Sequence, residues 1–233
     1  MDDSSISKQT AGKKAVDFIK AGMIVGLGTG STFQYALEEI GNRLKKGALI
    51  NISCLASSVK TEQRARQLGI PLTSFKHFQE IDLTIDGADE VSNHLDLIKG
   101  GGGALMREKI LAQNSHRFIV IVDETKVSTF LGEKWTVPVE VLPFAWEVEA
   151  HYLKSIGVNS QIRLNKDNEM YCTDQGNYIL DCQFGVIKEP EEIAALLDRR
   201  AGILAHGLFI KLATDVIIAS GDQIRHVTAN RQQ

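Results

Sequence analysis

The sequence is poor in the features that mark secreted, membrane-spanning and nucleic-acid-binding proteins. Only three of its 233 residues are cysteines, Cys54, Cys172 and Cys182. They form no Cys-x-x-Cys pair, which argues against a zinc site or a disulfide framework and favours a reducing, cytoplasmic environment. No apolar run approaches the roughly 20 residues of a membrane-spanning helix. The N-terminal segment MDDSSISKQT is too acidic and polar for a secretory signal.

Charge and aromatic content are equally modest. The formal net charge is −3, from 26 basic and 29 acidic residues, and aromatic residues make up 6% of the chain. Because no basic stripe is present, nucleic acid is not an expected partner. Apolar residues amount to 43%, so the chain can bury one large core, or a main core and a smaller one.

Apolar stretches and helical patterns alternate over the first half of the chain. Strands are expected at 23–27, 49–55, 81–85 and 118–122, and helices at 7–21, 31–46, 59–68 and from near Gly103 or Ala104 onward. Ser7 or Thr10 is expected to cap the first helix. Near-continuous apolar strands connected by helices predict an α/β fold with a parallel sheet covered on both faces.

The pattern changes after residue 131. A strand at 136–143, a helix at 145–156, three short strands around Ile162, Met170 and Ile179, and a helix at 191–199 are expected there. Together they predict a compact α+β unit inserted into the α/β chain. The last strands, around Val216 and Val227, are expected to return to the main sheet.

The segment Gly26–Thr32, GLGTGST, stands directly between an expected strand and an expected helix. Its glycines let the backbone approach a ligand closely, and the amides at the helix start favour an anion such as phosphate. The hydroxyls of Ser31 and Thr32 add hydrogen-bond donors. The plain structural alternative is a tight turn with Ser31 as the helix N-cap. Phe33 stands where a dinucleotide fingerprint needs its third glycine, and the Gly-Lys-Ser/Thr ending of a nucleoside triphosphate loop is missing, so neither cofactor is supported.

Three acidic residues crowd the end of the third expected strand, in the sequence Asp86-Gly87-Ala88-Asp89-Glu90. Ligands of open α/β sheets bind beyond the carboxyl ends of the strands. The mutual repulsion of the carboxylates requires a cation or a ligand, and sugar hydroxyls are good partners for such acceptors. An Asx-type turn with exposed charges and a Mg²⁺ site are the alternatives.

Four consecutive glycines, Gly100–Gly103, follow Lys99 and precede the helix that holds Glu108. Such a run is costly in chain entropy, which favours a close approach of the backbone to a ligand. Lys99 is a candidate to neutralise a phosphate or the preceding carboxylates. Glu108 falls near the helix start, where the helix dipole favours a carboxylate, and is a candidate general base. The alternative is a solvated helix residue, because Arg107 and Lys109 flank it.

Taken together, these motifs resemble those of the ribose-5-phosphate isomerase A family. GLGTGST, SSVKTEQRARQLGI (Ser57–Ile70), DGADE and KGGGGALMREKI occur in the family's order and with similar spacing. Residues 118–132, 138–143 and 173–177 are similar to the family as well, so the resemblance spans nearly the whole chain.

The resemblance implies a Rossmann-like main domain, residues 1–131 and 206–233, and a small ferredoxin-like α+β domain, residues 132–205. It also implies an aldose–ketose isomerase that interconverts D-ribose 5-phosphate and D-ribulose 5-phosphate through an enediol or enediolate, in the pentose phosphate pathway. Such an enzyme uses no metal and no redox cofactor. Its implied partners are a small sugar phosphate and further copies of the chain, in a cytoplasmic homodimer or homotetramer.

The resemblance matches Glu108 with the family's catalytic base, and Asp86, Asp89 and Lys99 are the other candidate catalytic residues. Substrate-binding positions of the family match Thr29, Gly30, Ser31, Thr32, Asp86, Gly87, Ala88, Asp89, Lys99, Gly100, Gly101, Gly102 and Lys126. Both aspartates stay candidates for opening the sugar ring. The sequence departs from the family pattern at Met106, where threonine is usual, and so lacks a hydroxyl near the base.

Three other functions fit parts of the pattern. An isomerase or deaminase of amino-sugar phosphates on a related fold would need motifs of its own, which are missing. A sugar-phosphate sensor domain of a transcription regulator would carry an N-terminal helix-turn-helix, and only about 22 residues precede the first expected strand. A coenzyme A transferase relative would place an acyl-carrying glutamate in a different setting. Lys99 together with Glu108 favours an enzyme.

Overall fold

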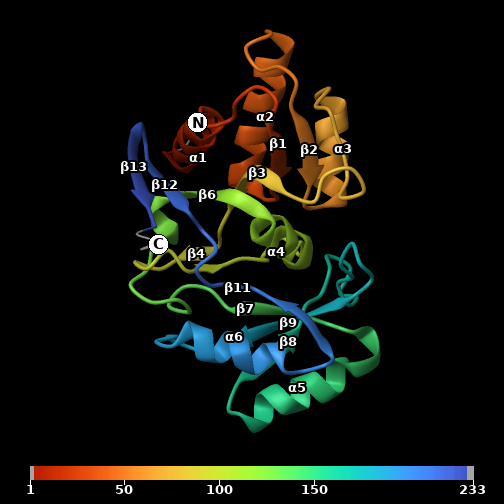
Figure 1. Cartoon of the computed structure of the whole chain (residues 1–233). Helices are drawn as coiled ribbons and strands as arrows, with labels where there is room; N and C mark the ends of the chain where they lie inside the picture. The colour runs from red at the N-terminus through yellow and green to blue at the C-terminus, as the bar shows by residue number, and fades with distance from the viewer. Residues whose placement is uncertain (1–2, 230–233) are drawn as a thin grey trace. The chain divides into compact units, whose positions relative to one another are not determined.

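The computed structural model describes residues 3–229, which form two compact units that the chain visits in turn (Figure 1). The first unit takes in the residues up to Ala88, Arg107–Lys126, and the residues from Lys211 onward. The second takes in Asp89–Met106 and Val127–Ile210. Within residues 3–229, every helix is too short or too polar to cross a membrane.

A six-stranded sheet forms the centre of the first unit. Its strands are β1 (Ile24–Leu27), β2 (Ser53–Ala56), β3 (Ile81–Gly87), β6 (Ser115–Asp123), β12 (Asp215–Ser220) and β13 (Gln223–Thr228). Their order is β13-β12-β6-β3-β1-β2, and every neighbouring pair is parallel except β12 and β13. The winding therefore reverses between β1 and β3, where ligands bind in doubly wound sheets.

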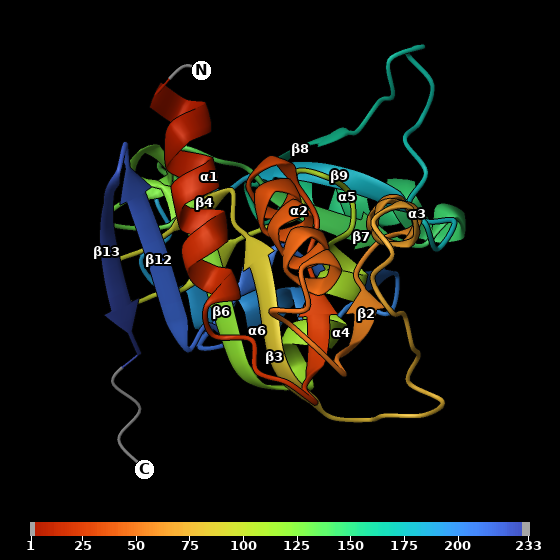
Figure 2. The same cartoon turned by 90° about the horizontal axis from the view of Figure 1, so that it is seen from above.

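Helices cover both faces of this sheet, because its strands are apolar on both sides. The helices are α1 (Asp3–Val16), α2 (Ser31–Lys45), α3 (Val59–Gln67) and α4 (Leu105–Gln113), and α1 and α2 lie together over the strands in Figure 2. Phe33 of α2 joins the main core with Leu27, Ile85 and Ile119. Leu111 of α4 packs in a smaller cluster with strand residues of β2 and β3.

The first helix differs from its prediction. It begins at Asp3 and ends at Val16, so Ser7 lies inside it and caps nothing. The Ser7 hydroxyl is buried and instead accepts a hydrogen bond from the Gly221 N–H at 2.8 Å. This contact links residues 214 positions apart, and local sequence rules do not reveal it.

The second unit contains a four-stranded antiparallel sheet with two helices. Its elements follow one another as β7 (Val137–Val141), α5 (Trp146–Ser155), β8 (Asn159–Ile162), β9 (Tyr178–Gln183), α6 (Pro190–Asp198) and β10 (Ile203–His206). The sheet order is β10-β7-β9-β8. This β-α-β-β-α-β arrangement is ferredoxin-like. The strand expected around Met170 is absent, since Met170 makes only an isolated bridge with Leu164.

A small antiparallel sheet also belongs to the second unit. It joins β4 (Glu90–Val91), β5 (Leu97–Ile98) and β11 (Leu208–Phe209) in the order β11-β5-β4. Short 3-10 turns, η1 (Glu124–Lys126) and η2 (Pro143–Ala145), complete the elements of the chain. The predicted fold class, an α/β unit with a parallel sheet and a separate small α+β unit, is confirmed. The predicted small domain, residues 132–205, falls inside the second unit, and its bounds stay a prediction.

Candidate active site

Two loops of the first unit meet where β1 and β3 end. The Thr29 N–H donates to Asp86 Oδ1 at 2.9 Å, and the Gly87 N–H donates to the same oxygen at 2.7 Å. A Cβ on Gly28 would lie 2.2 Å from Asp86 Oδ1 and 2.6 Å from Asp86 Cα. The glycine-rich loop therefore touches the aspartate directly, and only glycine fits at position 28.

The Thr29 hydroxyl connects the same loop to the start of α3. Its Oγ1 lies 2.7 Å from Ser57 Oγ, 2.9 Å from Ser58 Oγ and 3.2 Å from Thr61 Oγ1. Thr61 Oγ1 in turn donates to the Gly28 carbonyl at 2.8 Å. Sequence reasoning gave these three hydroxyl residues no role. The sequence did carry a signal for two of them, the three-residue spacing of Ser58 and Thr61, which is typical of a helix start. Ser58 is the N-cap of α3, and its hydroxyl accepts a hydrogen bond from the Thr61 N–H at 3.1 Å.

The start of α2 offers an anion site beside this loop. Gly30 occupies the N-cap position with φ 113° and ψ 172°, a conformation that favours glycine, and no side chain caps the helix. Ser31 is the first helical residue, so the alternative in which Ser31 caps the helix is wrong. Ser31 is exposed and Thr32 is half-buried. Their N–H groups belong to the first turn, where no helical carbonyl can accept from them.

Glu108 and Lys126 also lie at the carboxyl ends of the parallel strands, as the glycine-rich loop does. Glu108 lies in the first turn of α4 and is 4% exposed. A helix that connects parallel strands runs back along them, so its N-terminal turn lies at their carboxyl ends. Lys126 ends the short turn η1 directly after β6, the strand that pairs with β3. Because the Glu108 side chain is buried, the alternative in which it is a solvated helix residue is wrong.

The second unit holds the other predicted residues. Lys99 follows β5, is 2% exposed, and places its ammonium 5.5 Å from the centre of the Phe209 ring. The Gly101 N–H donates to Asp89 Oδ2 at 2.7 Å. A Cβ on Gly101 would lie 2.8 Å from Asp89 Oδ1. The structure thus brings Asp89 and the glycine run together.

Backbone amides hold the carboxylates that crowd residues 86–90. Glu90 is fully buried and accepts from the Gly132 N–H at 2.9 Å and the Lys134 N–H at 3.1 Å. It is thus a structural residue, whereas Asp86 and Asp89 each accept amides of a glycine-rich loop. No group of three or more His, Cys, Asp or Glu side chains within residues 3–229 is arranged to hold a metal ion.

The sequence profile described as ribose 5-phosphate isomerase A (phosphoriboisomerase A) matches residues 53–223. The chain belongs to the ribose 5-phosphate isomerase A family. Ribose-5-phosphate isomerase A of Gluconobacter oxydans is 46% identical over 226 residues, which are 96% of this chain and 97% of the relative. The Chloroflexus aurantiacus protein of that name is 48% identical over 223 residues, 96% of this chain and 93% of its own.

Solved structures of the family have the same fold. The ribose 5-phosphate isomerase of Plasmodium falciparum is 39% identical with a TM-score of 0.94, and covers 97% of this chain and 100% of its own. A D-ribose-5-phosphate isomerase in complex with phospho-erythronic acid is 34% identical, also with a TM-score of 0.94, over 98% of this chain and 100% of its own.

The family departure at Met106 has a packing role in this chain. Met106 is the second residue of α4, and its side chain packs against the buried cluster of Leu105, Ile179 and Ala205. Its backbone N–H donates to the buried Glu140 carboxylate. Burial raises the pKa of Glu140, while hydrogen bonds from Asn177 and Thr173 counteract that rise.

Replacing Gly28 with alanine is expected to disturb the loop at Gly26–Thr32. The new Cβ would overlap the backbone of Asp86, and such overpacking costs about 1–3 kcal/mol. We expect a lower melting temperature and weaker sugar-phosphate binding, measured by thermal denaturation and calorimetry. Gly87→Ala is the matched folding control, because the nearest atoms to its Cβ would lie at 3.9 Å. Equal melting temperatures for the two variants would contradict this steric account.

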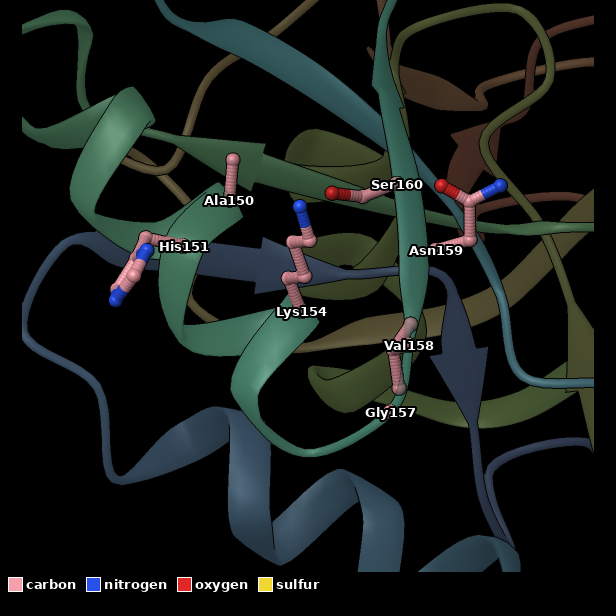
Figure 3. Close-up of a pocket in the computed structure, with 7 residues that line it drawn as sticks. All are labelled: Ala150, His151, Lys154, Gly157, Val158, Asn159 and Ser160. Atoms are coloured by element: carbon pink, nitrogen blue, oxygen red, sulfur yellow. The ribbon is translucent and has the colours of Figure 1, made fainter.

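A separate hollow of about 520 Å³ lies on the second unit (Figure 3). It lies between the end of α5 and the start of β8, and is lined by Ala150, His151, Lys154, Gly157, Val158, Asn159 and Ser160. None of the predicted site residues lines it. In Figure 3 the His151 ring points away from Ser160.

Proposed function

We propose that Glu108 is the catalytic base of this chain and moves a proton between C2 and C1 of the sugar phosphate. The chain interconverts D-ribose 5-phosphate and D-ribulose 5-phosphate, a reaction of the pentose phosphate pathway. The observation that carries the proposal is the burial of Glu108 in the first turn of α4, at the ligand-binding edge of the sheet. A carboxylate there is shielded from water and is favoured by the helix dipole.

The first step is opening of the sugar ring. Ribose 5-phosphate is mostly cyclic, so a proton must leave the C1 hydroxyl and another must reach the ring oxygen. We assign this transfer to Asp86 or Asp89, with Lys99 as a donor. Both carboxylates are fixed by backbone amides, which keeps them in one orientation.

The second step is the proton transfer. Glu108 removes the proton from C2, and the C1 carbonyl electrons move onto O1 to give a cis-enediolate. A proton passes from O2 to O1, Glu108 returns its proton to C1, and C2 becomes the carbonyl. Charge develops on the oxygens in the transition state, and we assign its stabilisation to Lys99 and the amides of Gly100 and Gly102, because the Gly101 N–H already donates to Asp89.

The phosphate is assigned to the start of α2. The amides of Gly30–Thr32 and the hydroxyls of Ser31 and Thr32 are suited to an anion, and Lys126 adds a positive charge. Thr29, whose N–H and hydroxyl bond within the protein, holds the loop in shape. Phosphate binding energy holds the open chain in place for the chemistry. The phospho-erythronic acid bound by a relative combines a phosphate with a carboxylate, which supports a site for both anions.

Isomerisation in D₂O tests the proton transfer. A carboxylate base exchanges its proton with solvent in some turnovers, so we expect deuterium at C1 of the ribulose 5-phosphate, detected by proton NMR. The same experiment on Glu108→Gln assigns the base: C1 deuteration and turnover that match the wild type would contradict the role of Glu108.

The proposal also covers the oligomeric state of the chain and its location in the cell. We infer a homodimer or homotetramer, which light scattering on the purified protein would measure. A cytoplasmic location is supported by the cysteines, which form no disulfide: Cys54 and Cys182 are buried and Cys172 is exposed. Burial raises the pKa of the Cys54 thiol to about 12, as in an inert core residue.

A further inference from the structure

The glycine run after Lys99 is held by one arginine of the second unit. Arg163, which directly follows β8, directs its Nη1 to the Gly100 carbonyl at 2.8 Å and to the Gly101 carbonyl at 3.2 Å. Neither sequence motifs nor the assigned catalytic steps gave Arg163 a role. A single guanidinium nitrogen thus binds two successive peptides of a segment that the proposed reaction uses.

Asp181 on β9 fixes the orientation of this guanidinium. It accepts from Arg163 Nε at 2.9 Å and also from Nη2, which makes a bidentate pair. The Arg163 side chain is only 14% exposed. A bidentate carboxylate holds the planar guanidinium more rigidly than a single contact does. The pair also neutralises its own charge, so Arg163 acts on the glycine run mainly through geometry.

Because the peptide unit is planar, a contact that holds a carbonyl also fixes the direction of the N–H that follows it. In a trans peptide the C=O and the following N–H point in opposite directions. Binding the Gly100 carbonyl therefore orients the Gly101 N–H, which donates to Asp89 Oδ2 at 2.7 Å. Binding the Gly101 carbonyl likewise directs the Gly102 N–H away from the guanidinium.

Four glycines in succession need such an external constraint. The backbone of each glycine has more freedom to lose than that of any other residue, so an unbraced run samples many amide directions. Gly100 and Gly103 have φ of 103° and 78°, which other residues rarely adopt. On the opposite end of the run, Tyr171 packs so closely that a Cβ on Gly103 would lie 2.3 Å from its Oη.

We propose that Arg163, fixed by Asp181, is a positioning residue of the isomerase that sets the amide directions of Gly101 and Gly102. This inference rests on the proposed function, in which the Gly102 amide is assigned to the enediolate, and Asp89, held by the Gly101 N–H, is a candidate for ring opening. Preorganised donors lower the barrier only while their direction is fixed before the charge develops. Loss of the brace is therefore expected to lower kcat more than it raises KM.

The test compares steady-state kinetics of Arg163→Met, Arg163→Lys and Asp181→Asn with those of the wild type. Arg163→Met keeps much of the side-chain volume and removes all four hydrogen bonds. We expect kcat to fall about 10–100-fold with KM changed less than threefold. Arg163→Lys has one ammonium in place of a fork and is expected to restore only part of the loss. Should Arg163→Met not fold, Arg163→Lys and Asp181→Asn carry the test.

Arg200→Met is the matched control. Arg200 forms a similar bidentate pair with the buried Glu149 of α5, at 2.8 and 3.2 Å, in the same unit. This variant is expected to lose thermal stability and to keep kcat. Hydrogen exchange measured by mass spectrometry gives a second readout: peptides covering 99–103 should exchange faster in Arg163→Met than in Arg200→Met.

The outcomes separate this inference from the proposed function. An active wild type, with unchanged kcat and unchanged exchange over 99–103 in a folded Arg163→Met, would overturn the role of Arg163 alone. A fall in kcat of the same size in Arg200→Met would also overturn it, because the effect would then follow general stability. A folded wild type without turnover on ribose 5-phosphate would overturn both proposals.

Discussion

Glu108→Gln is expected to lower kcat for ribose 5-phosphate by about 10²–10⁴-fold, the usual contribution of a positioned general base. Glutamine has nearly the same shape as glutamate but cannot take the C2 proton. KM and the melting temperature are expected to change little, since the substitution leaves the backbone of α4 and of the Gly26–Thr32 loop intact. Stopped-flow or coupled assays of ribulose 5-phosphate formation, together with thermal denaturation, measure both quantities.

Glu147→Gln provides the control for this prediction. Glu147 also lies in the first turn of a helix, α5, but its side chain is exposed. It should leave kcat unchanged. Turnover of Glu108→Gln within a few-fold of the wild type would remove Glu108 from the catalytic role and would shift the search for the base to Asp86 and Asp89.

Lys99→Met is expected to lower kcat by about 10²–10³-fold, as does the loss of one donor to a developing oxyanion. The methionine side chain keeps the apolar stem that packs by Phe209, so the fold should persist. Because the ammonium is assigned to the transition state, KM should change far less than kcat. Full kinetic curves over a range of ribose 5-phosphate concentrations separate the two constants.

A different division between the constants would change the role of Lys99. A rise in KM with kcat preserved would make it a ground-state binding residue. Lys154→Met is the control, because Lys154 is an exposed lysine of α5 and belongs to no assigned site. Equal losses of kcat in both variants would contradict a specific contribution of Lys99.

The parallel sheet was predictable because its strands are short, apolar and separated by helical patterns. The predicted strand at 81–85 and helix at 31–46 differ from β3 and α2 by two residues or fewer at each end. Composition alone did not give the strand order. The pairing of β1 with both β2 and β3 depends on contacts between residues about 30 to 60 positions apart.

Local rules failed where a distant partner decides the structure. The Ser7 hydroxyl satisfies an amide near the C-terminus, so a residue type that often caps helices lies inside one. The segment around Met170 has an apolar residue every few positions, but a turn closed by the Asn165 N–H and the Glu169 carbonyl leaves room for only one bridge.

The candidate site was predictable in its motifs and not in its supports. Glycine runs and clustered acids stand out in a sequence because they are costly in ordinary folds. The supports are residues of common types. The hydroxyls of Ser57 and Thr61 contact Thr29, and the guanidinium of Arg163 binds the glycine run. Only their distances in the folded chain show which backbone groups they hold.

The most direct test of the account is turnover of ribose 5-phosphate by the purified wild type in excess EDTA. A metal-free base mechanism predicts ribulose 5-phosphate formation at the same rate with and without the chelator. A folded protein that binds the sugar phosphate but makes no ribulose 5-phosphate in EDTA, and regains turnover when a divalent metal is added, would contradict it.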